Sequence, residues 1–296
     1  MSRLNIDDLI VGERVQQLAD AYIGTQEDFC FNPIIRSQPN KHANINILQN
    51  MMEWNNPTIV FFYTHRIHDI AQIIGKLKNP VVLISHNSDQ NIYDDEDTKK
   101  IINCKNVYGW ISQNVTFIDR THNKLIPIGI GLANSMWNHG DLRAFSYFFE
   151  KKSEIVKTKD VFFNFQIETN RIVRQPCFDA LKEYYFFSPK ITPTGNHIRL
   201  SEYKFCICPE GNGVDTHRLW EALYLKVVPI VLHTPFAEVL LEQKIPILVV
   251  SSWDKVPCAL EKVKYEDYDF TMIEEKYTMD GIKKTLDMLV QRIPRL

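Results

Sequence analysis

The sequence predicts an α/β protein with two successive Rossmann-like domains, each a parallel sheet with helices on both faces. Short apolar strands alternate with helical patterns along most of the chain, which is typical of parallel sheets. The 296 residues fit two domains of the usual size, about 100–200 residues each. The alternation pauses at the Lys-rich stretch 151–159 and then restarts. We therefore expect domains at 1–155 and 156–296, with a cleft between them.

The first half is expected to contain a helix at each end and four strands between them. Apolar residues at helical spacing predict an amphipathic helix over residues 5–22. Residues 24–56 are polar and Asn-rich, which indicates a long connection with one short helix near 45–54. The charged pattern of 141–156 predicts another amphipathic helix. The intervening elements are strands at 58–63, 80–85, 107–111 and 125–128 and a helix at 67–77.

The second half repeats the alternation. Its predicted strands are 161–165, 203–208, 228–232 and 247–250. Its predicted helices are 170–185, 216–225 and 235–242, followed by two more that end near Arg292. In open α/β sheets, ligands bind at the carboxyl ends of the strands. The loops that follow the strands are therefore where site residues are expected.

Composition excludes several classes of function. The net charge of −2 argues against nucleic-acid binding, which needs a concentrated basic surface. The start of the chain does not resemble a signal peptide, and no apolar run reaches the ~18 residues of a membrane span. The six scattered cysteines indicate reduced thiols, with Cys206 and Cys208 in the core. These features together predict a cytoplasmic protein without a membrane span.

No metal site is expected from the acidic clusters. The Asp-Tyr-Asp at 267–269 falls among late helices, whereas a metal-binding Asp-x-Asp of a transferase would end a strand. The acidic run at 94–97 is interpreted as the solvated start of a helix.

Residues 204–232 form the most informative segment. A strand, a turn with two glycines, a helix and a strand that begins near Pro229 follow one another. Asp215 or Thr216 is expected to cap the helix, whose start suits a phosphate. Arg218 and Glu221 lie on one helix face, where an exposed surface pair is the alternative interpretation. The candidates for contacting a phosphate-containing ligand in this turn are Glu210, Gly211, Asn212, Gly213, Asp215 and Thr216.

This segment resembles the signature of the exostosin family of glycosyltransferases. The resemblance implies a GT-B fold, a UDP-sugar donor, inversion at the anomeric carbon and no essential metal. It also implies that Arg218 contacts the diphosphate and Glu221 the ribose. The matching residues are Pro209, Gly211, Asp215, Arg218, Glu221, Ala222, Leu223, Pro229 and Ile230.

In its short length the chain resembles compact exostosin-like enzymes of large algal viruses or bacteria. Among the viral members, xylosyl transfer from UDP-xylose is one activity. A viral member would act in the host cytoplasm.

A second strand end offers further donor contacts. Asn164 lies near the end of the strand at 161–165, and Arg171 and Arg174 lie at the start of the next helix. Arg171 is closer to the helix start and is the preferred phosphate contact. A solvated basic helix face is the alternative.

The first domain is expected to bind a glycan acceptor and to supply the general base. The candidates for the base are His65, Asp69, His86 and Asp89, which follow predicted strands. Helix capping and turn closure are the alternative roles for these four residues. Trp137, His139 and Asn114 are the candidates for contacting the acceptor sugar, and Trp110 is a further candidate. Ordinary loop packing is the alternative role for these residues.

The predicted function is an inverting glycosyltransferase that moves a sugar from a UDP-sugar to a hydroxyl of a glycan acceptor. A sugar epimerase is a second possibility, but the first strand–helix turn lacks the glycine fingerprint of dinucleotide binding. A non-catalytic nucleotide- or sugar-binding protein on the same scaffold is the alternative from another class.

Overall fold

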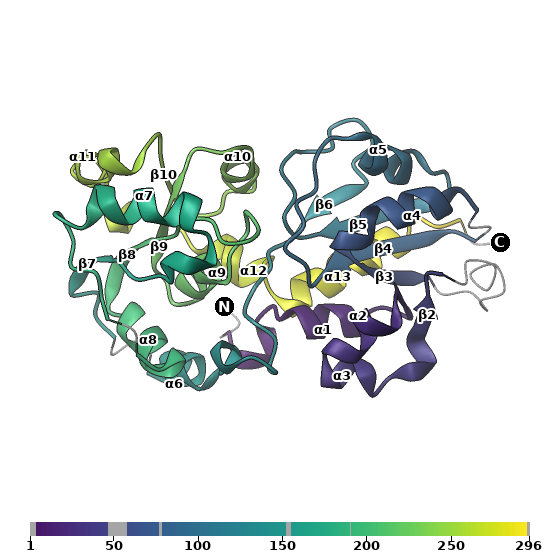
Figure 1. Cartoon of the computed structure of the whole chain (residues 1–296), viewed down its shortest axis with the longest axis horizontal. Coiled ribbons are helices and arrows are strands. Elements are labelled where there is room, and N and C mark those ends of the chain that lie inside the picture. The colour runs from purple at the N-terminus through teal and green to yellow at the C-terminus, as the bar shows by residue number, and fades with distance from the viewer. Residues whose placement is uncertain (1–3, 47–57, 77–78, 152–154, 190, 295–296) are drawn as a thin grey trace. The chain divides into compact units, whose positions relative to one another are not determined.

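The computed structural model describes residues 4–46, 58–76, 79–151, 155–189 and 191–294, and forms two compact units (Figure 1). The first-sheet unit comprises Ile10–Ile130 and Met279–Leu296, and the second-sheet unit comprises Met1–Leu9 and Gly131–Thr278. The main division therefore falls at residue 130 and not at 155, and the last helix belongs to the first-sheet unit. The helix expected near 45–54 falls mostly outside the described residues.

The first-sheet unit contains a six-stranded parallel sheet in the order β2-β1-β3-β4-β5-β6. All four strands predicted for this half are confirmed as β3 to β6. All six residues of β4 are buried, as expected for a parallel strand covered on both faces. The strands are β1 (Ala21–Gly24), β2 (His42–Asn44), β3 (Ile59–Tyr63), β4 (Val81–His86), β5 (Val107–Ser112) and β6 (Leu125–Pro127).

The single helix predicted over 5–22 is wrong, and only its middle part is α-helical. The chain forms the 3₁₀ turn η1 (Ile6–Asp8), the short helix α1 (Gly12–Gln17) and then strand β1. All four residues of β1 are buried, because the strand lies between β2 and β3. A buried four-residue strand has no alternating pattern, so its apolar residues extended the apparent helical spacing.

The strand order of this sheet changes direction beside β1. Strand β2 lies on one side of β1, and β3 with the rest of the sheet lies on the other. The crevice at the carboxyl ends of β1 and β3 is therefore the switch point where open α/β sheets bind ligands. The helices of this unit are α1, α2 (Gln26–Phe31), α3 (Pro33–Arg36), α4 (Ile67–Ile73), α5 (Glu96–Asn103) and α13 (Met279–Val290).

The second-sheet unit contains a four-stranded parallel sheet in the order β10-β9-β8-β7. All four predicted strands are confirmed. A parallel bridge between Phe163 and Phe187 gives β7 a neighbour on its other side, so the order changes direction between β7 and β8. The strands are β7 (Lys159–Phe162), β8 (Tyr203–Ile207), β9 (Val228–Leu232) and β10 (Leu248–Val250).

Seven helices are described in this unit, and α10 has the predicted bounds. Both cysteines of the Cys-x-Cys pair are buried at β8, which confirms their assignment to the core. None of the helices in the described ranges combines the length and the apolar character that crossing a bilayer requires. The helices are α6 (Arg143–Lys151), α7 (Arg171–Leu181), α8 (Pro193–Leu200), α9 (His217–Tyr224), α10 (Pro235–Glu242), α11 (Val256–Leu260) and α12 (Thr271–Glu275).

Gly109 on β5 allows α13 to pack closely against the first sheet. A Cβ at position 109 would lie 2.5 Å from Cδ2 of Leu289, which is fully buried. Gly109→Ala is therefore expected to lower the free energy of unfolding by about 1–3 kcal/mol, measured by urea denaturation. Gly75→Ala is the matched control, because no atom lies within 4 Å of its added Cβ. If Gly109→Ala and Leu289→Ala had strictly additive effects, the proposed contact would be contradicted.

Candidate functional site

A histidine–aspartate pair lies at the switch point of the first sheet. His65 belongs to the 3₁₀ turn η4 (Thr64–Arg66), directly after β3. Asp28 lies in the first turn of α2, directly after β1. Because β1 and β3 are parallel neighbours, their carboxyl ends bring the two residues together, with His65 Nε2 2.9 Å from Asp28 Oδ1.

The surroundings of Asp28 keep its carboxylate ionised. Burial raises the pKa of this carboxyl, but hydrogen bonds from His65, the Thr25 backbone N–H and Arg66 outweigh that effect and hold it well below its usual range. Arg66 Nε donates to Asp28 Oδ2 at 3.0 Å. An ionised carboxylate accepts hydrogen bonds only, so it selects the neutral tautomer that has its proton on Nε2 and its lone pair on Nδ1. The His65 side chain is 41% exposed, which leaves its ring accessible to a ligand.

A buried hydrogen-bond chain supports this pair. Tyr63 donates through its hydroxyl to the Asp28 carbonyl at 3.1 Å and receives a bond from Gln16 at 2.9 Å. Asn87 Nδ2 donates to Gln16 Oε1 at 2.8 Å. The loop after β4 is thereby linked to the end of β3. The Oγ atom of Ser88 in the same loop lies 3.3 Å from His65 Nδ1.

The other first-sheet candidates lie elsewhere. His86 is 1% exposed and donates from Nε2 to the Gly129 carbonyl at 3.2 Å. Asp69 is exposed on α4, 3.8 Å from Arg66 Nη1, and Asp89 is exposed in the loop after β4. Of the four candidates for the base, His65 is therefore the one for which the structure describes a buried carboxylate partner.

Two of the residues expected to contact the acceptor have structural roles here. Asn114 is fully buried and donates to the Ser88 carbonyl at 3.0 Å. Trp110 is also fully buried, and its Nε1 donates to Ser85 Oγ at 2.8 Å. The prediction that a sugar stacks on Trp110 is therefore wrong, because the core covers both faces of its ring.

In the second-sheet unit, Arg218 and Glu221 form a buried cluster with His197. Glu221 is 5% exposed and has both oxygens engaged, Oε2 by Arg218 Nε at 2.9 Å and Oε1 by His197 Nε2 at 3.2 Å. Arg218 Nη1 donates to the Asn164 carbonyl at 2.5 Å, and its guanidinium lies over the Phe162 ring. The alternative of an exposed surface pair is therefore wrong.

Electrostatics in this cluster keep the pair charged. Burial raises the pKa of Glu221, but His197 and Arg218 outweigh it and hold the pKa well below its usual range. Burial lowers the pKa of Arg218, but the charge of Glu221 more than compensates, so the pKa of Arg218 is raised. Arg218 Nη2 makes no hydrogen bond to any described residue, and the side chain is 19% exposed. The Nη2 atom is therefore the donor that this Arg can offer to a ligand.

The start of α9 lies beside this cluster. Thr216 is its N-cap residue, but the Thr216 side chain makes no capping hydrogen bond, which corrects that part of the prediction. Asp215 instead accepts a bond from Trp220 Nε1 at 2.6 Å. His217 Nδ1 donates to the Gly131 carbonyl at 2.8 Å, which leaves Nε2 for other partners. His217 is a site residue that the sequence analysis missed.

Trp137 and His139 also lie near this helix start. The His139 ring is 6.0 Å from that of His217 and stacks against Trp137, whose side chain is exposed. Burial, His217 and His197 lower the pKa of His139. Both residues belong to the second-sheet unit and not to the predicted acceptor domain.

Arg174, and not Arg171, holds the turn after β8. Arg174 is buried, and its Nε donates to the Glu210 carbonyl at 2.9 Å. Arg171 is 68% exposed and pairs with Glu168, as the alternative of a solvated helix face suggested. Asn164 Nδ2 donates to the Ser188 carbonyl at 2.7 Å.

The turn itself closes through its glycines. Gly211 N–H donates to the Gly213 carbonyl at 3.1 Å, and Asn170 Nδ2 donates to the Gly211 carbonyl at 2.7 Å. Both glycines are buried, whereas Asn212 is exposed at the tip. The turn thus places Glu210 at the carboxyl end of the sheet.

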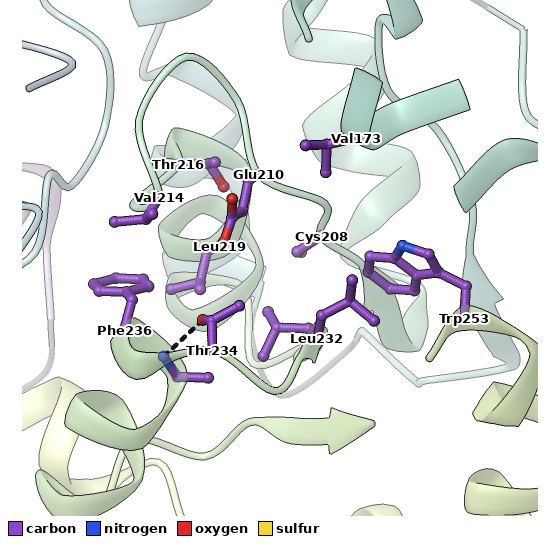
Figure 2. A pocket seen from close by; sticks show the side chains of 12 residues that line it. Val173, Cys208, Glu210, Val214, Thr216, Leu219, Leu232, Thr234, Phe236 and Trp253 are labelled. Carbon is purple, nitrogen blue, oxygen red and sulfur yellow. Dashed lines mark hydrogen bonds between the residues drawn. The ribbon is translucent and has the colours of Figure 1, made fainter. Parts of the chain in front are cut away.

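A cavity of about 160 Å³ lies at the carboxyl ends of β8 and β9, beside the starts of α9 and α10 (Figure 2). Phe236 and Trp253 lie on opposite sides in this view, with Leu219, Leu232 and Cys208 between them. The volume is several times the ~30 Å³ of a water molecule but below the roughly 300–1,000 Å³ of whole-ligand pockets. It therefore fits one planar ring. Its lining residues are Val173, Cys208, Glu210, Val214, Thr216, Leu219, Val231, Leu232, Thr234, Phe236, Ala237 and Trp253.

Among the residues that the structure describes, no cluster of three or more His, Cys, Asp or Glu side chains could hold a metal ion. The Asp-Tyr-Asp at 267–269 begins in the 3₁₀ turn η9 (Tyr265–Asp267) of the second-sheet unit and does not directly follow a strand.

No protein-family model matches the sequence, and no curated protein matches it. The chain is similar in structure to UDP-GlcNAc 2-epimerase from Methanocaldococcus jannaschii, at 13% identity and a TM-score of 0.44, covering 90% of this chain and 91% of that one. It is similar to the calicheamicin glycosyltransferase CalG4 at 11% identity and a TM-score of 0.43, covering 93% and 91%. A DNA-modifying β-glucosyltransferase matches at 10% identity and a TM-score of 0.31, covering 85% and 83%.

Proposed function

We propose that this chain is an inverting glycosyltransferase that moves a sugar from a UDP-sugar to a hydroxyl of a glycan acceptor. The observation that carries the proposal is the set of groups at the carboxyl edge of the second sheet. There Arg218 and His217 lie at the start of α9, beside an apolar cavity that contains the carboxylate of Glu210. A guanidinium and a helix start next to a ring-sized apolar cavity are groups that suit a nucleoside diphosphate.

The donor half of the reaction is assigned to this edge. Arg218 Nη2, His217 Nε2 and the backbone at the start of α9 would bind the diphosphate. They would stabilise the negative charge that develops on the diphosphate as it leaves. The exostosin resemblance rests on Arg218 and the same turn, and it supports the same assignment. We expect no metal requirement, because the Arg218 guanidinium and the backbone N–H groups at the start of α9 provide the charge compensation.

The acceptor half is assigned to the first sheet. His65 Nδ1 would take the proton of the acceptor hydroxyl while its oxygen bonds to the anomeric carbon. The bond from that carbon to the diphosphate oxygen breaks in the same step, so the configuration inverts. Asp28 would stabilise the imidazolium that forms. The His65–Asp28 pair favours catalysis over the alternative of a non-catalytic binding protein.

Donor binding can be tested by thermal unfolding with a panel of nucleotides and nucleotide sugars, including UDP, GDP, UDP-glucose, UDP-N-acetylglucosamine and UDP-xylose, each with and without EDTA. A ligand at about 100 times its Kd stabilises the folded state by about 2.7 kcal/mol. We expect a UDP-selective rise of the midpoint that survives EDTA and is much smaller in Arg218→Lys, which keeps the charge but not the planar fork. The absence of any shift in folded wild-type protein would contradict the donor site.

Sugar transfer is tested separately by measuring UDP release with the donor found in that panel and a set of oligosaccharide acceptors. Acceptor-dependent UDP release supports the proposal, with UDP-xylose as one candidate donor. Conversion of UDP-N-acetylglucosamine to its epimer, or UDP binding with no reaction, would contradict it.

A further inference from the structure

The carboxylate of Glu210 differs from other buried acids of the second-sheet unit. The Glu210 backbone carbonyl accepts a bond from Arg174, but its carboxylate makes no hydrogen bond or ion pair with any described residue. The side chain is partly buried and lines the apolar cavity (Figure 2). Burial raises the pKa of this carboxyl. Placing an unpaired carboxylate there costs free energy in the free protein, which is typical of a group that binds a ligand.

Glu221 has the opposite environment. Its two oxygens are both occupied, by Arg218 and by His197, and the residue is 5% exposed. The exostosin resemblance assigns the ribose to Glu221, but this carboxylate is buried and each of its oxygens already has a partner within the protein. Its contacts instead fix the guanidinium of Arg218, whose Nη1 is also held by the Asn164 carbonyl.

We propose that Glu210, and not Glu221, accepts the hydrogen bonds of the donor's ribose hydroxyls, and that Glu221 is a positioning residue for Arg218. This inference rests on the proposed function, because it takes a nucleoside diphosphate as the ligand. Vicinal hydroxyls match a carboxylate, whose two oxygens can each accept one hydrogen bond.

The position of Glu210 within the cavity favours ribose over the other parts of the nucleotide. The apolar residues Phe236, Leu232 and Trp253 provide a surface for the base. The start of α9, next to Thr216, is the place for the diphosphate, which a carboxylate would repel. Ribose links the base to the diphosphate, and its hydroxyls are neutral donors. Glu210 lines the same cavity as the apolar residues and Thr216. Its carboxylate is therefore placed to accept hydrogen bonds from the ribose, the part of the ligand between the base and the diphosphate.

The test measures binding of UDP, 2′-deoxy-UDP and 3′-deoxy-UDP by calorimetry to the wild type, Glu210→Gln and Glu221→Gln. A hydrogen bond to a charged group is worth about tenfold or more in affinity. We expect the wild type to bind UDP about tenfold more tightly than at least one deoxy analogue, and Glu210→Gln to bind them with similar affinity. Glu221→Gln should weaken all three ligands and keep the discrimination. Glu275→Gln is the matched control, because Glu275 is exposed at the end of α12 and should leave every Kd unchanged.

The possible results separate this inference from the proposed function. If the wild type bound none of the three ligands, the proposed function would be overturned. Binding in which Glu210→Gln keeps the ribose discrimination would overturn the role of Glu210 alone. CDP is measured alongside the three ligands. If the effect of Glu210→Gln were instead a changed preference between UDP and CDP, the role of Glu210 toward ribose would also be overturned, since the carboxylate would then contact the base. Circular dichroism checks that Glu221→Gln is folded, and the Glu210→Gln comparison does not depend on it.

Discussion

Replacing His65 by asparagine is expected to lower kcat for sugar transfer by about 10²–10⁴-fold, the usual contribution of a general base. Asparagine is neutral and polar, but its amide nitrogen has no lone pair that could accept a proton, so the proton acceptor is lost. The Kd for the donor should not change, because the donor contacts are assigned to the other unit. Steady-state kinetics, with calorimetry for donor affinity, measures each effect.

His68→Asn provides a matched control for this experiment. His68 also forms a pair with an aspartate, at 2.8 Å from Asp97, but it is 71% exposed on α4. Its replacement should leave kcat unchanged. If His65→Asn retained full activity, or lost no more than His68→Asn, the assignment of the base would be contradicted. Asp28→Asn should lower kcat as well, because an amide cannot stabilise the imidazolium, and should weaken the start of α2 by about 1 kcal/mol.

Replacing Glu221 by glutamine is expected to lower the free energy of unfolding by about 3–5 kcal/mol, measured by urea denaturation. The amide leaves the buried Arg218 without its counter-charge and removes an acceptor from His197. Most of this effect is the cost of leaving the desolvated charge of Arg218 unpaired, and the lost hydrogen bond itself contributes less.

Glu168→Gln is the control for the buried pair, because Glu168 and Arg171 have the same i,i+3 separation but are 66% and 68% exposed. It should change the free energy of unfolding by less than about 1 kcal/mol. A similar loss in both variants would contradict the importance of burial.

The pH dependence of the free energy of unfolding provides a second test of the buried Arg218–Glu221 pair. The pKa of Glu221 is lowered in the folded state, so its contribution to stability is present above the unfolded value of about 4.3. That contribution is lost as the pH falls through the folded value. The difference in stability between the wild type and Glu221→Gln should therefore shrink in acid.

The sequence predicted the strands well because the sheets are parallel and buried. Strands β4 and β9 appear as continuous apolar runs bounded by turn residues, and the structure places them close to the expected bounds. Strand β1 was missed because its apolar residues continue the helical spacing of the preceding segment, and β2 was missed because its sequence, His-Ala-Asn, lies in a polar stretch. The boundary between the units was displaced for another reason. Sequence patterns describe local elements, whereas the position of α13 depends on contacts with β4 and β5, far away in the chain.

The His65–Asp28 pair shows the corresponding limit for the site. The sequence pointed to His65 as one of four residues, but Asp28 lay in a polar stretch without a clear period. Their contact depends on β1 being the neighbour of β3, and that strand had been taken for part of a helix. One local signal was available. Thr25 and Asp28 form a capping box, whose Thr-x-x-Asp spacing marks a helix start directly after an apolar run.

The arrangement of α13 also affects how the protein emerges during synthesis. The six strands of the first sheet are translated before residue 130, but α13, which packs against β4 and β5, is translated after the whole second sheet. At about 5–20 residues per second, synthesis of the chain from the end of β6 to the end of α13 takes roughly 10–30 seconds, during which the sheet lacks this cover. During that interval the face around Gly109 lacks the side chain of Leu289. Nascent chains should therefore expose an apolar surface that chaperones recognise until the last helix has left the ribosome.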